Sequence, residues 1–176
     1  MLENLKKLEE SGTVGGSDYF KVANGNNIIR VLSEGVYHES TYTDKKTGKV
    51  SITKKFVMFV IDRKDTSDDH KTGKVKPYFA PYTVYKDIAS LEEDPFYAFQ
   101  GMPMPYDVNV KVINAGTLDA EYNVQASPNK SEITPDELVA AKEKGSIADY
   151  VKGLDKQDGQ PTDASTFSDG TPVPVQ

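Results

Sequence analysis

The chain has 176 residues and is 37% hydrophobic, with two histidines and no cysteine. This length fits one compact domain with extensions, and the missing cysteines exclude disulfides, thiolate catalysis and the usual structural zinc sites. There is no run of about 18 apolar residues and no apolar N-terminal stretch of signal-peptide length, so we expect an intracellular protein without membrane contact.

The net charge of -6 is distributed unevenly along the chain. Phe20 to Lys86 contains 13 Lys or Arg against 7 Asp or Glu, whereas Ser131 to Gln176 contains 4 against 9. A basic segment followed by an acidic end is the asymmetry expected of a nucleic-acid-binding protein.

The first half of the chain predicts a short helix and then strands. After an amphipathic helix at Leu2 to Glu10, YFKV and NIIRVLS predict a hairpin around Asn24-Gly25, because Asn-Gly favours tight turns. GVYHESTYT and VSITKKFVMFVIDR predict a second hairpin with a cationic tip, DKKTGK. The middle of ITKKFVMFVIDR is apolar on both faces. That strand is therefore either buried on both sides or offers an aromatic, basic face to a partner.

The second half adds a strand, a helix, a hairpin and a helical end. VKPYFAP predicts a strand, and TVYKDIASLEED predicts a helix with Val84, Ile88 and Leu91 on one stripe. YDVNVKVINAG and EYNVQAS predict the last hairpin, with Tyr106, Val108, Val110 and Val112 on one face. Thr134 to Glu137 has the pattern of a capping box, with a helix end at Gly145, and SIADYVKG predicts a further helical segment.

This order of elements predicts a mainly β protein. Five or six short strands with one inserted helix suit an OB-fold-like Greek-key barrel, although the strand number alone would also allow a sandwich. We expect an N-terminal arm at 1–18, the barrel core at 19–130, a helical extension at 131–153 and a disordered acidic tail at 154–176.

Aromatic and basic residues occur together in the core segment. Eight of its aromatic residues are Tyr37, Tyr42, Phe56, Phe59, Tyr78, Phe79, Tyr82 and Tyr85. Single-stranded nucleic acid is bound by such a mixture, because rings stack on bases for about 1 to 3 kcal/mol each and lysines neutralise phosphates. The same residues could equally form an ordinary core with a solvated lysine rim.

Signals for catalysis are weaker. The loop from Asp62 to His70 has carboxylates that could hold a divalent ion, but it lacks the spacing of a calcium loop and contains lysines. His38 has no cysteine or evident serine partner. We therefore expect no enzymatic activity, no catalytic residues, no metal and no cofactor.

The motifs NNIIRVLSE, KFVMFVIDRKD, KPYFAPYTVYKDIASL and YDVNVKV with AEYNV occur in an order that resembles the single-stranded DNA-binding proteins of tailed bacteriophages. These helix-destabilising proteins are distantly related to the T-even type. The resemblance covers about Tyr19 to Ser127 and implies an OB-fold that coats single-stranded DNA during replication, recombination and repair in the cytoplasm of an infected bacterium. Further implied partners are replication or recombination proteins at the C-terminal tail and other copies of the chain on DNA.

The chain departs from the T-even type in two respects. It has no cysteines for the zinc ribbon, and its N-terminal basic segment is reduced to Lys6 and Lys7. The expected DNA-binding residues are Arg30, Tyr37, Tyr42, Lys45, Lys46, Lys54, Lys55, Phe56, Phe59, Arg63, Lys76 and Tyr78. A slip of one residue in register would exchange Phe56 for Phe59 as the stacking ring. The alternative interpretation is a β-barrel module for protein interaction or virion assembly that does not bind DNA.

Overall fold

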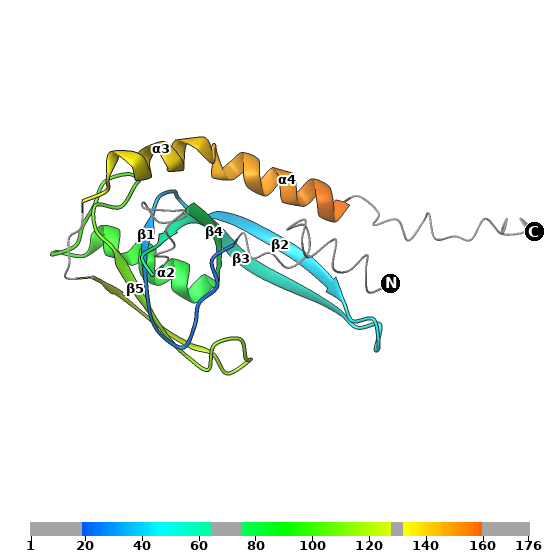
Figure 1. The fold of residues 1–176 in the computed structure, drawn as a ribbon. Helices are drawn as coiled ribbons and strands as arrows, with labels where there is room; N and C mark the ends of the chain where they lie inside the picture. Colours follow the sequence, from blue (N-terminus) through cyan, green and yellow to red (C-terminus); the bar gives the residue numbers. More distant parts are fainter. Residues whose placement is uncertain (1–18, 65–74, 128–131, 160–176) are drawn as a thin grey trace, which may run out of the picture.

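The computed structural model describes residues 19–64, 75–127 and 132–159. In these residues six antiparallel strands form one open sheet, with helices against both of its faces (Figure 1). The strands are β1 (Gly25–Val31), β2 (Val36–Thr43), β3 (Val50–Asp62), β4 (Val75–Ala80), β5 (Val108–Ile113) and β6 (Glu121–Ala126). The helices are α2 (Tyr82–Ser90), the 3-10 helix η1 (Leu91–Glu93), α3 (Pro135–Glu143) and α4 (Ile147–Gly159).

Strand β3 is the centre of the sheet. Its first part pairs with β2, its last residues pair with β1 on the same edge, and β4 pairs along its other edge. The sheet continues from β1 to β5 and β6, so the full order is β2-β3-β1-β5-β6. The β2–β3 and β5–β6 hairpins agree with the sequence predictions, and the β2–β3 ribbon extends away from the rest of the sheet (Figure 1).

The predicted hairpin around Asn24-Gly25 is wrong. Strand β1 pairs with β3 and β5, while the preceding segment lies beside β4, where the Phe20 amide donates a hydrogen bond to the Pro77 carbonyl at 2.8 Å. Phe20 is buried against Tyr78, with ring centroids 5.2 Å apart. Burial of this large side chain outweighs the local turn preference of Asn-Gly.

Two hydrophobic clusters lie on opposite faces of β3. The first contains Met58 and Val60 and packs against α2 through Val84 and Ile88, which confirms these two members of the predicted stripe. The third, Leu91, lies in η1 and packs, partly buried, against the same cluster. It also contains the predicted buried face of β5 with Tyr106, Val108, Val110 and Val112. The second cluster contains Phe59, Ile61 and Val75, and it is covered by side chains of α3 and α4.

The C-terminal helices begin as predicted and extend further. Thr134 and Glu137 form the reciprocal hydrogen bonds of a capping box, and Pro135 is the first residue of α3. Gly145, with φ of +73°, follows α3 in the left-handed conformation that glycine tolerates. Helix α4 continues to Gly159, so residues 154–159 of the predicted tail are helical. The predicted N-terminal helix, the Asp65 to His70 part of the charged loop and the rest of the tail lie outside the described residues.

Candidate nucleic-acid interface

Burial of β3 changes along its length rather than between its faces. Residues Val50 to Lys54 are exposed, whereas Val57 to Ile61 are buried on both sides of the sheet. The sequence leaves two alternatives for this strand, and its second half is buried on both sides because α3 and α4 cover the outer face at Phe59 and Ile61. The accessible part of β3 is therefore its first half, which forms the ribbon with β2.

An aromatic surface lies where this ribbon meets α2. Phe56 is half-buried, and its ring stacks on Tyr85 with centroids 4.1 Å apart and an interplanar angle of 7°. Tyr37, its cross-strand partner, contacts Phe56 edge-on at 5.7 Å, and Tyr82 lies at 6.2 Å. Tyr37 and Tyr82 are 48% and 61% exposed. We call Tyr37, Phe56, Tyr82, Tyr85 and Lys54 the ribbon surface. Its rings most available for stacking are Tyr37 and Tyr82, with Phe56 as their support.

Gly35 allows the Tyr85 ring to lie against the backbone. A Cβ atom at position 35 would come within 2.3 Å of the Tyr85 ring. That separation is a severe clash, so a larger residue there would displace Tyr85 and with it the stacked support of Phe56. The sequence contained the aromatic residues but gave no sign that Gly35 and the start of α2 would assemble them.

The β2–β3 turn supplies positive charge at the other end of the ribbon from this surface. Lys45, Lys46 and Lys49 are all exposed at the turn. The amides of Thr47 and Lys46 donate hydrogen bonds to the Asp44 carboxylate, and they lower its pKa. Asp44 therefore shapes the turn while the lysines remain directed to solvent. Lys54, which lies on the same face as Phe56, is also exposed.

Tyr37 makes one polar contact within the ribbon. Its hydroxyl donates a hydrogen bond to Glu39 at 2.8 Å, and this bond raises the pKa of Tyr37. Glu39 is the cross-strand neighbour of Lys54. The contact orients the phenol while half of the residue surface remains in solvent.

Three expected DNA-binding residues are buried, so the prediction that they present rings or a guanidinium to DNA on the exposed surface is wrong. Arg30 is 0% exposed, and its Nε donates to Asp107 at 2.6 Å. Phe59 packs against Tyr150 of α4, with ring centroids 5.6 Å apart. Tyr78 is 3% exposed in the main cluster. None of the three offers a ring face or a guanidinium on the exposed surface, because the fold surrounds β1, β3 and β4 with other elements at these positions, although Tyr78 also lines a groove.

The other expected residues are divided between the two faces of the sheet. Arg63 donates to Asp107 at 3.1 Å and forms an ion pair with Glu137, so it holds α3 against the sheet. Tyr42 is 63% exposed, and Lys55 is half-buried next to His38 across the strand pair. By strand alternation, these two lie on the opposite face from Phe56. Lys76 is half-buried in β4.

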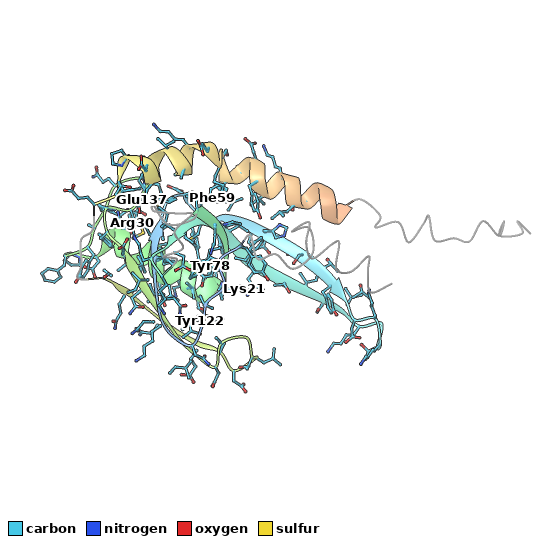
Figure 2. All side chains as sticks on the ribbon, in the orientation of Figure 1. Lys21, Arg30, Phe59, Tyr78, Tyr122 and Glu137 are labelled. Atoms are coloured by element: carbon cyan, nitrogen blue, oxygen red, sulfur yellow. The ribbon has the colours of Figure 1, made fainter. Side chains whose placement is uncertain are left out.

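Figure 2 shows Arg30, Phe59 and Glu137 on the side of the sheet near α3.

In the part of the chain that the structure covers, no group of three metal-ligating side chains is close enough to hold an ion, and no helix is long and apolar enough to span a membrane. Comparison of the chain with protein-family models, curated proteins and solved structures gave no match.

Proposed function

We propose that this chain is a sequence-nonspecific single-stranded DNA-binding protein without catalytic activity. The observation that carries the proposal is the ribbon surface, where two exposed tyrosines flank Phe56 and Lys54 lies one step along the same strand face, with three further exposed lysines at the tip of the ribbon. Stacking on rings does not depend on base identity, and lysines contact phosphates without reading sequence. Bases would stack on Tyr37 and Tyr82, while the backbone follows the lysines toward the turn.

The strand order supports an OB-type arrangement as part of this proposal. The β2–β3 hairpin is followed by β4, and α2 lies between β4 and β5 along the chain. The last hairpin, β5–β6, pairs with β1 through β5. Among the described strands, β4 and β6 do not pair with each other, so the proposed barrel has an open seam between them. The resemblance of the motif order to phage proteins extends the proposal to coating of DNA in phage replication, recombination and repair.

The test compares exposed aromatic residues on and off the ribbon surface. Affinity for a labelled oligo-dT is measured for the wild type, Tyr37→Ala and Tyr82→Ala at low salt. Loss of one stacking ring, at about 1 to 3 kcal/mol, should weaken binding about 5- to 150-fold. Phe96→Ala is the matched control, because Phe96 is 86% exposed between η1 and β5. Equal affinities for all four proteins would reject this surface.

A second candidate function is supported by two further side chains. Val50 and Ile52 are 57% and 58% exposed on the same face of β3 as Phe56. Exposed apolar residues of this kind also occur in subunit interfaces. A protein-interaction or virion module would form a fixed oligomer without DNA, and Ile52→Glu would dissociate it in size-exclusion chromatography. A DNA-binding ribbon predicts a monomer whose size changes only when DNA is added.

A further inference from the structure

A groove lies at the open seam between β4 and the β5–β6 hairpin. It has a volume of about 280 Å³, and six of its lining residues are Tyr19, Lys21, Lys55, Tyr78, Phe79 and Tyr122. Figure 2 shows Lys21, Tyr78 and Tyr122, which all line this groove. Binding sites for small organic molecules range from about 300 to 1,000 Å³, so this groove suits a single planar group.

The segment before β1 is fixed in place as one wall of the groove. Phe20 points into the core and is hydrogen-bonded to β4, so its neighbours Tyr19 and Lys21 are left exposed. The Tyr19 ring contacts Phe79 edge-on at 5.9 Å, and the Lys21 ammonium lies 4.9 Å from the centre of the Tyr19 ring. This wall therefore presents a ring and a cation from adjacent positions.

Tyr78 lines the groove and carries an unsatisfied hydroxyl. It is buried and has no hydrogen-bond partner among the described residues. A buried hydroxyl without a partner costs free energy, and such groups are rare in folded proteins. Burial, and then the neighbouring Tyr122, raise the pKa of Tyr78, so the hydroxyl keeps its proton at neutral pH and can donate it to a ligand.

The groove and the ribbon surface involve neighbouring residues of the chain. Pro81 lines the groove, and the next residue, Tyr82, is part of the ribbon surface. Lys55 also lines the groove, but it lies on the opposite face of β3 from Lys54 and Phe56. A strand bound to both sites would therefore pass from one face of β3 to the other.

We propose that the groove binds one nucleotide of single-stranded DNA, with the base against the aromatic walls, the Tyr78 hydroxyl donating to the base and Lys21 contacting a phosphate. This inference rests on the proposed function and adds a second subsite to it. The unsatisfied hydroxyl gives this subsite a polar contact with a base in addition to ring contacts.

Tyr78→Phe tests the inference because it removes only the hydroxyl. Without its unpaired oxygen the protein should be as stable as the wild type or more stable, since a buried polar group is lost. Affinity for oligo-dT should nevertheless fall about 2- to 10-fold, which corresponds to one hydrogen bond. A purely structural role for Tyr78 would leave that affinity unchanged.

Lys21→Ala provides a second variant with a different readout. Its plot of log affinity against log salt should be shallower than that of the wild type by about 0.7, the value for one phosphate contact. Lys111→Ala is the control, because Lys111 is exposed on the outer face of β5 and is not part of the groove lining. Its salt dependence should equal that of the wild type.

The outcomes separate this inference from the proposed function. If the wild type does not bind oligo-dT, both are rejected. If the wild type binds and Tyr82→Ala weakens binding, the proposed function stands. Wild-type affinity in Tyr78→Phe, together with an unchanged salt dependence in Lys21→Ala, would then overturn the groove as a subsite.

Discussion

Replacing Arg30 with methionine tests whether this side chain stabilises the fold or contacts DNA. Arg30 is fully buried and donates to Asp107 at 2.6 Å, and Arg63 donates to the same carboxylate at 3.1 Å. Arg63 also pairs with Glu137 in the first turn of α3. Arg30→Met would therefore weaken a charge network that joins β1, the start of β5 and α3.

The expected cost follows from the burial of this pair. Removing one partner of a buried ion pair costs about 3 to 5 kcal/mol, because the other charge remains buried. Asp107 keeps its bond from Arg63 in this variant, so we expect a loss of about 3 kcal/mol in the free energy of unfolding. For a chain of this size, that loss lowers the melting temperature by about 6 to 12 °C.

Urea unfolding gives the stability, and oligo-dT titration at a temperature where the variant is folded gives the affinity. Arg30→Met should lose stability and keep the wild-type dependence of affinity on salt. Lys54→Met is the matched comparison, since Lys54 is exposed on the ribbon surface and should show the reverse. Its stability should be unchanged, and its salt slope should be shallower by about 0.7. A shallower slope in Arg30→Met without loss of stability would refute the structural role.

Three further predictions concern the packing, the capping and the ionisation of single residues. Phe59→Ala should cost about 3 to 5 kcal/mol of stability, measured by urea unfolding, and leave the DNA affinity of the folded protein unchanged, because Phe59 is buried beneath α4. Thr134→Ala should cost about 1 kcal/mol by removing the cap of α3, and Thr134→Ser should restore most of it in the same measurement. Burial raises the pKa of Tyr106 from 10.0 to about 12, so an absorbance titration should show a tyrosine that ionises late. The contribution of neutral Tyr106 to the free energy of unfolding should be complete below about pH 10 and lost as pH rises through 12. A single titration step near pH 10 for all tyrosines would contradict this.

Local chemistry in the sequence was sufficient to predict many elements. The capping box at Thr134 and Glu137, the alternation around Val108 and the stripe at Val84 all appear in the structure, because each depends on residues close in sequence. The Asn24-Gly25 hairpin failed because the burial of Phe20 beside β4 is a contact between residues far apart in sequence.

The candidate site was predicted only in part, and for the same physical reason. Tyr37, Phe56 and Lys54 lie together, as a strand pairing inferred from the turn would place them. Phe59 and Arg30 have the same residue types as such sites use, but α4 and Asp107 take them into the interior. Sequence pattern alone does not show which face of a strand a distant helix will cover.

The most direct test of the central claim is a titration with oligo-dT at several salt concentrations. Quenching of tyrosine fluorescence monitors binding in this titration. The ribbon surface and its turn offer four exposed lysines, Lys45, Lys46, Lys49 and Lys54. With about 0.7 per phosphate contact, three or four contacts predict a slope of about -2 to -3 together with clear quenching. An absence of quenching at low salt, or an affinity that does not change with salt, would contradict the account.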